Sequence, residues 1–245
     1  MQWPWIIAFT FSGFLASLAT NSIGVGGGLL VMPTLALWFP ARQVVVFTTP
    51  MFLANAIATW YNYRYSWKVP RTLWTIPWVL MGIVIGVHFL VNESTRDLDI
   101  TIGLIALIFV VYEVIQRTLR KQVTGLPGWV GIPIALTSGG ISAISNIGGT
   151  LLSLYVLSPE VTPDGFVGSL ALLYVIMTSA KLCLFWFHHL ILGQTFLWSL
   201  PSIPSIIVGS LVGKKIHRGI NPSRFRLIVI GVIFISSLAL LLSSI

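Results

Sequence analysis

Lys181 is the residue with the clearest potential for chemistry. It lies in the middle of an apolar run from Tyr174 to Phe187. If this run crosses a membrane, a charge at that depth costs at least ~2.5 kcal/mol, and such residues usually mark substrate or ion pathways. None of the six acidic residues lies at the centre of an apolar segment, so a bound anion is a natural counter-ion. The alternatives are that Lys181 lies off-centre and extends to the membrane surface, or that backbone carbonyls stabilise it.

Two glycine-rich stretches interrupt the apolar sequence in a related way. One runs from Asn21 to Gly28 and the other from Ser145 to Thr150. Each glycine costs a helix roughly 1 kcal/mol relative to alanine, so both stretches predict a broken helix. The N–H groups and positive dipole at the start of a half-helix bind anions. The candidate binding residues are therefore Asn21, Gly26, Gly27, Gly28, Asn146, Gly148, Gly149 and Thr150. The alternative is a packing kink where two helices cross.

Asn55 is expected at a depth similar to that of Lys181, in the corresponding apolar segment of the first half of the chain. It is a further candidate for binding. Polar side chains in such a segment either line a cavity or form hydrogen bonds between helices, and both readings stay open.

Several other kinds of site are not favoured. The glycine-rich run is no dinucleotide loop, because position 29 is leucine, and no Lys-Ser/Thr follows it as in a P-loop. The single cysteine, Cys183, excludes a disulfide framework and a cysteine-based metal site. Central carboxylate pairs and a His-Glu-x-x-His motif are missing from the sequence, so we expect no enzyme, no metal and no cofactor.

The composition identifies the environment of these residues. Of the 245 residues, 56% are hydrophobic and only 8% are charged, whereas soluble domains carry about 25% charged residues. The sequence therefore predicts an all-α polytopic membrane protein. The net charge of +8 is interpreted as a signal of topology and not of nucleic-acid binding. Met1 to Pro4 contain no basic residue, so we expect no cleaved signal peptide.

The apolar segments fall into two matching sets. The first half, residues 1–122, and the second half, residues 123–245, form one transmembrane domain. The glycine-rich stretches correspond at an offset of 122 residues, and Ile-Pro followed by a Gly-x-x-x-Gly pair occurs near positions 76 and 203. The predicted segments are 5–20, 29–39, 43–63, 74–91 and 100–115, and then 129–144, 151–157, 166–187, 196–212 and 227–242. Residues 29–39 are too short to span a membrane as a helix.

The basic residues predict the topology. Eleven of the 14 lie in three loops, near positions 64–71, 117–121 and 214–226, which the positive-inside rule assigns to the cytoplasm. Both termini then lie outside, and each half is a glycine-broken hairpin plus three crossings. Because that number of net passes is odd, the two halves are inverted repeats, as in many secondary transporters. Re-entrant and fully spanning hairpins satisfy this topology equally well.

The run Gly24-x-Gly26-Gly27-Gly28-Leu-Leu-Val-Met-Pro33, with its weaker repeat at Gly148-Gly149-Thr150, resembles the TauE/SafE family, the sulfite exporter or toluene sulfonate uptake permease family. The resemblance covers essentially the whole chain, including the span with Lys181. It implies a transporter, often an exporter, of sulfite, organosulfonates or related small anions. The second opening departs from the family by having Thr150 in place of a third glycine, and the first has about three extra residues around Asn21.

Together these features predict a secondary transporter, with a small sulfite, sulfonate or carboxylate anion held between the broken helices and Lys181. The alternative is an anion-selective channel. We expect a multi-pass protein of the cell membrane, with the lipid bilayer and the anion as partners and no nucleic acid. The substrate, the coupling ion, the direction of transport and a homodimeric state stay open.

Overall fold

A computed structural model describes residues 3–24, 27–66, 73–119, 127–156, 162–191, 199–219, 231, 233–235 and 237–242. These residues are largely helical and include no strand. The helices are α1 (Trp3–Ile23), α2 (Gly27–Ala36), α3 (Ala41–Tyr63), α5 (Ile76–Asn92), α6 (Thr95–Leu119), η1 (Gly128–Val130), α7 (Gly131–Ser145), α8 (Gly149–Val156), α9 (Pro163–Phe187) and α11 (Ser202–Gly219). The predicted all-α class is confirmed.

The described residues contain three helices that are long and apolar enough to cross a membrane. They are Ala41–Tyr63, Gly128–Ser145 and Pro163–Phe187. Large apolar side chains remain exposed on the outer helices, such as Met81, Ile108 and Leu211. A polytopic protein places such side chains against lipid, where they need no protein partner.

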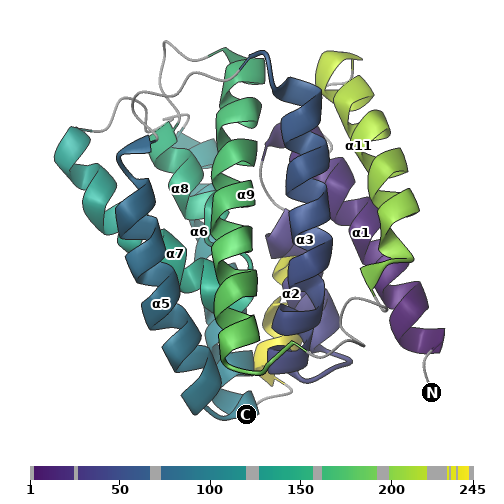
Figure 1. Cartoon of the computed structure of the whole chain (residues 1–245), viewed down its shortest axis with the longest axis vertical. Helices are drawn as coiled ribbons and strands as arrows, with labels where there is room; N and C mark the ends of the chain where they lie inside the picture. Colours follow the sequence, from purple (N-terminus) through teal and green to yellow (C-terminus); the bar gives the residue numbers. More distant parts are fainter. Residues whose placement is uncertain are drawn as a thin grey trace.

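Three helix pairs organise the structure (Figure 1). The central pair is α3 and α9, which pack side by side; α5 packs along α7 on one flank and α1 along α11 on the other. Each of these pairs joins a helix from the first half of the chain to a helix from the second half. The inverted relation between the halves stays a prediction, which we use below.

Small residues allow one flanking pair to approach closely. A Cβ atom at Gly82 would overlap the carbonyl of Leu136, and a Cβ at Gly139 would overlap the carbonyl of Val79. Because the backbones of α5 and α7 meet at these points, only glycine fits there. The Gly-x-x-x-Gly spacing of α5 therefore serves close helix packing.

Both helix interruptions use the same backbone conformation. Gly24 follows α1 with φ = 82° and Asn146 follows α7 with φ = 55°, both left-handed. The N–H of Gly24 donates to Thr20 O at 2.9 Å, and the N–H of Asn146 donates to Ser142 O at 3.0 Å. A left-handed residue directly after a helix is a common way to end it. The first interruption starts later than predicted, because Asn21 still belongs to α1.

Candidate functional site

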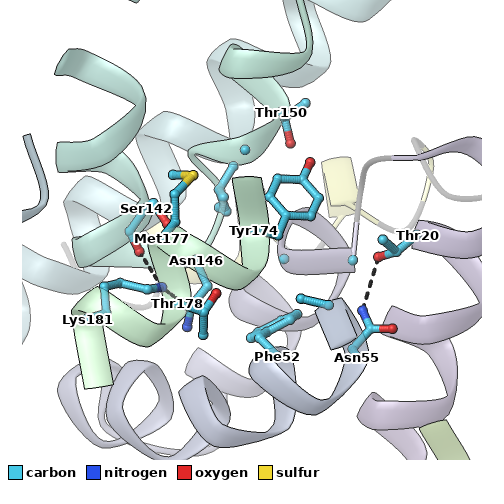
Figure 2. A pocket seen from close by; sticks show the side chains of 15 residues that line it. Thr20, Phe52, Asn55, Ser142, Asn146, Thr150, Tyr174, Met177, Thr178 and Lys181 are labelled. Carbon is cyan, nitrogen blue, oxygen red and sulfur yellow. Dashed lines mark hydrogen bonds between the residues drawn. The ribbon is translucent and has the colours of Figure 1, made fainter. Parts of the chain in front are cut away.

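A small cavity lies between the two central helices and the two interruptions (Figure 2). Its volume is about 50 Å³, and α1, α2, α3, α7, α8 and α9 all contribute to its lining. The lining residues are Thr20, Gly27, Gly28, Phe52, Asn55, Ala56, Ser142, Asn146, Ile147, Gly149, Thr150, Tyr174, Met177, Thr178 and Lys181.

Lys181 supplies the positive charge in this cavity. Its side chain is 1% exposed, and Nζ donates to Ser142 O at 3.0 Å and to Asn146 Oδ1. None of the lining residues is acidic. Two neutral acceptors partly solvate the ammonium, but they do not cancel its charge, and a buried charge without a counter-ion is costly. The cavity is therefore suited to an anion.

Asn146 is held so that its oxygen faces Lys181. Its Nδ2 donates to Thr48 Oγ1 at 3.1 Å and to Val45 O at 3.3 Å, both on α3. The hydroxyl of Thr48 already donates to Val44 O at 2.6 Å, so its oxygen accepts the bond from Asn146. This fixes the orientation of the amide. Asn146 thereby links α3 to the lysine on α9.

The first half has a related pair on the opposite side of the cavity (Figure 2). Asn55 Nδ2 donates to Thr20 Oγ1 at 3.3 Å. Because Thr20 Oγ1 donates its own proton to Ala16 O at 2.8 Å, it accepts from Asn55. Asn55 Oδ1 is then left buried, without a partner among the described residues. The cavity thus has a cationic side at Lys181 and a neutral side at Asn55.

The two interruptions touch each other at the cavity. A Cβ atom at Gly28, in the first turn of α2, would overlap the carbonyl oxygen of Asn146. At Gly149, the first residue of α8, a Cβ would overlap the ring of Tyr174 on α9. The glycines therefore let two half-helix starts and α9 meet around one small space.

The free N–H groups at the start of α8 are fewer than predicted. The N–H of Thr150 donates to Ile147 O at 2.9 Å, and that of Leu151 donates to Gly148 O at 3.0 Å. These bonds leave Thr150 to act through its side chain, which lines the cavity. A binding role for Thr150 stays a prediction.

Seven of the ten candidate residues line the cavity, two described residues lie elsewhere, and one is outside the described residues. Asn21 is buried between α1 and α3, where Nδ2 donates to Thr59 Oγ1 at 2.9 Å and Oδ1 accepts from Asn62 at 3.2 Å. Gly148 packs on α7 and accepts from Ser138 Oγ at 2.7 Å. Gly26 lies outside the described residues. The candidates in the cavity lining are Gly27, Gly28, Asn55, Asn146, Gly149, Thr150 and Lys181.

Sequence reasoning missed Thr20, Ser142 and Tyr174 as lining residues. Thr20 and Ser142 each lie four positions before the left-handed residue that ends their helix. They are 122 residues apart, which is the offset between the glycine-rich stretches, so aligning the two halves would have paired them. Nothing in the sequence around Tyr174 indicated that it contacts Gly149.

Comparison with known proteins gives one match. The family described as "Sulfite exporter TauE/SafE" matches residues 9–240, which is nearly the whole chain. No curated protein and no solved structure matches.

Proposed function

The chain belongs to the sulfite exporter TauE/SafE family, and from this premise we propose that it carries sulfite or an anion of similar size by alternating access. The family makes it a multi-pass membrane transporter of sulfite or related anions. Export, the site of binding and the mechanism are the parts that we propose. The site is the cavity at Lys181, and the transporter is not an enzyme.

One observation carries the proposal, namely that the described lining of the cavity includes a buried ammonium and no carboxylate. Lys181 is almost completely buried, and its bonded partners are a carbonyl and an amide oxygen. An anion in the cavity would supply the missing countercharge in a setting where charges interact strongly. The starts of α2 and α8 bring the positive ends of two helix dipoles to the same space.

The size of the cavity favours a compact oxyanion. The cavity volume of about 50 Å³ has room for roughly four water molecules, because one water needs about 10–15 Å³ of cavity volume. Sulfite has four heavy atoms and is of this size. An aromatic sulfonate would need a wider state of the cavity. We therefore place sulfite first among the sulfite, sulfonate and carboxylate substrates.

The helix pairing suggests how access would alternate. The halves meet along α1·α11, α3·α9 and α5·α7, and the cavity lies at the central pair. If the halves are inverted repeats, rocking one against the other would open the cavity to each side of the membrane in turn. With the basic loops in the cytoplasm, both termini are outside. The membrane is the plasma or inner membrane.

The test is sulfite flux in proteoliposomes that contain the purified protein. We expect saturable flux and counterflow of labelled sulfite, and at least a tenfold loss in Lys181→Met, because a hydrogen bond to a charged group is worth about 1.5–3 kcal/mol. Lys214→Met is the matched control: Lys214 Nζ also donates to a backbone carbonyl, that of Asn62 at 3.1 Å, but it does not line the cavity.

Equal flux in wild type and Lys181→Met would remove the lysine from binding. Conductance without counterflow would replace the carrier by an anion channel. An equal loss in Lys214→Met would show that the effect is not specific to the cavity.

A further inference from the structure

A second polar cluster joins three helices away from the anion cavity. His217, near the end of α11, is 15% exposed, and Asp164, in the first turn of α9, is 43% exposed. His217 Nδ1 lies 2.8 Å from Ser22 O on α1, and His217 Nε2 lies 3.2 Å from Asp164 Oδ1. The start of α9 and the end of α11 lie at the same end of the molecule (Figure 1). None of these residues lines the cavity.

The two partners of His217 determine where its protons lie. Ser22 O is a carbonyl, which only accepts, so Nδ1 carries a proton. An ionised Asp164 also only accepts, so the contact at Nε2 needs a second proton between the two groups. A neutral imidazole has a single N–H, so it donates either to Ser22 O or to Asp164, but not to both. His217 therefore bridges Ser22 and Asp164 at the same time only while the His217–Asp164 pair holds this additional proton.

The helix ends favour the same charges. Ser22 is one of the last residues of α1, whose final carbonyls have no partner within the helix. The carbonyl of Thr20 accepts from Gly24 N–H, that of Asn21 from Tyr63 Oη at 3.0 Å, and that of Ser22 from His217. A cation is stabilised at a helix C-terminus and an anion at a helix N-terminus. His217 and Asp164 occupy these two places.

The other titratable groups about His217 come from α3 and from α11 itself, among the residues that the structure describes. The ring of Tyr63 lies edge-on to the imidazole at a centroid distance of 5.9 Å. Lys214 directs Nζ toward Asn62 O and lies 5.6 Å from the centre of the Tyr63 ring. Asp164 is the carboxylate in contact with His217.

We propose that His217 and Asp164 form a proton-dependent latch that ties the end of α1 to the start of α9. When the pair loses its additional proton, the contact opens and frees the last turn of α1, which leads into the interruption before α2. Because α9 lines the anion cavity, as does Thr20 near the end of α1, the latch joins two helices that contribute to the cavity. The latch is a contact within the protein, and it does not depend on anion binding in the cavity.

The test is hydrogen–deuterium exchange of the full-length protein in lipid nanodiscs, corrected for the intrinsic pH dependence of exchange. We compare residues 12–23 and 163–170 at the two ends of the range in which histidines change charge, about pH 5 and about pH 8. In the wild type, exchange at the higher pH is about two- to tenfold faster, as expected from the loss of one hydrogen bond.

Asp164→Asn separates this latch from an ordinary ion pair. The amide of asparagine accepts from a charged imidazole and donates to the lone pair of a neutral one. We therefore expect exchange in this variant to stay slow at both pH values. His217→Ala removes both contacts and exchanges fast at both. The control His88→Ala changes an exposed histidine whose ring contacts the side-chain amide of Asn92 on its own helix, and it keeps the wild-type pH dependence.

Two results would overturn the latch. One is a wild-type exchange rate that does not depend on pH after correction. The other is faster exchange in Asp164→Asn than in the wild type at the lower pH, which is the behaviour of an ion pair that has merely lost its charge.

Discussion

The two helix interruptions are built alike in the backbone and differently in the side chains. Each ends its helix with a left-handed residue, Gly24 or Asn146, whose N–H donates to the carbonyl four residues earlier. Each has a polar side chain from a central helix bonded near it: Asn55 bonds Thr20 in the first half, and Lys181 bonds Ser142 in the second. The halves differ in that only the second has a cation there, and only its left-handed residue has a side chain.

This difference shows that one backbone conformation accommodates two different sets of side-chain contacts. The freed carbonyls of α1 accept from Tyr63 and His217, so the first interruption is held by structural bonds. At the second interruption the side chain of Asn146 binds Thr48 with one end and Lys181 with the other. Under the proposed function, a charge is needed on one side only, so no second cation has to be buried.

The largest expected effect comes from making the two halves alike. Lys181→Asn gives α9 the same side chain that α3 has at Asn55. Because the only charge among the described lining residues is lost, we expect sulfite flux to fall on the order of a hundredfold, the upper end for a hydrogen bond to a charged group. Flux in proteoliposomes, normalised to the amount of reconstituted protein, measures this. A flux near that of the wild type would mean that the two sides are equivalent.

A smaller effect, this time on stability, is expected where the interruptions touch. Gly28→Ala places a methyl group on the backbone carbonyl of Asn146, whereas Gly149→Ala meets the side-chain ring of Tyr174. Since backbone cannot move aside as a ring can, we expect Gly28→Ala to cost more than Gly149→Ala, within about 1–3 kcal/mol for an overpacked site. The midpoint of thermal unfolding in detergent measures the order, and the reverse order would contradict it.

Asn146 tests the side chain and the backbone of the second interruption separately. Asn146→Gly keeps the left-handed conformation but loses the bonds to Lys181 and Thr48, so we expect roughly tenfold lower flux, near 1.5 kcal/mol. Asn146→Ala adds the strain of a left-handed alanine, about 1–2 kcal/mol. Flux and unfolding midpoint are measured on both variants. Equal stability of the two would show that the left-handed turn relaxes, and full flux in Asn146→Gly would contradict the role of the amide.

Asn55 is expected to give the smallest effect. Asn55→Ala removes one neutral hydrogen bond, to Thr20, which is worth about 1 kcal/mol. We expect a slightly lower unfolding midpoint and less than about tenfold change in flux. The same two measurements apply, with Thr20→Val as the partner variant. A loss of flux as large as that of Lys181→Asn would show that the neutral side also binds the anion.

Several features followed from local composition. The apolar segments predicted the helices, because hydrocarbon admits few other spanning structures. Lys181 was identified because a lone cation among apolar residues is costly in a membrane and usually marks a substrate or ion pathway. The glycine-rich stretches predicted interruptions, since glycine weakens any helix. The family match over residues 9–240 confirms the resemblance that these motifs carried.

The sequence by itself therefore determined the all-helical class and the family, and it singled out Lys181 and the two glycine-rich stretches. Only the tertiary structure decided which groups meet. It placed Asn21 in a structural network and Asn146 between Lys181 and Thr48, although Asn146 and Thr48 are 98 positions apart. In the tertiary structure the N–H of Thr150 also donates within its own turn, and His217 contacts Ser22, which lies 195 positions away in the sequence. The physical reason is that a hydrogen bond depends on the direction of particular atoms, whereas hydrophobicity and helix propensity act residue by residue.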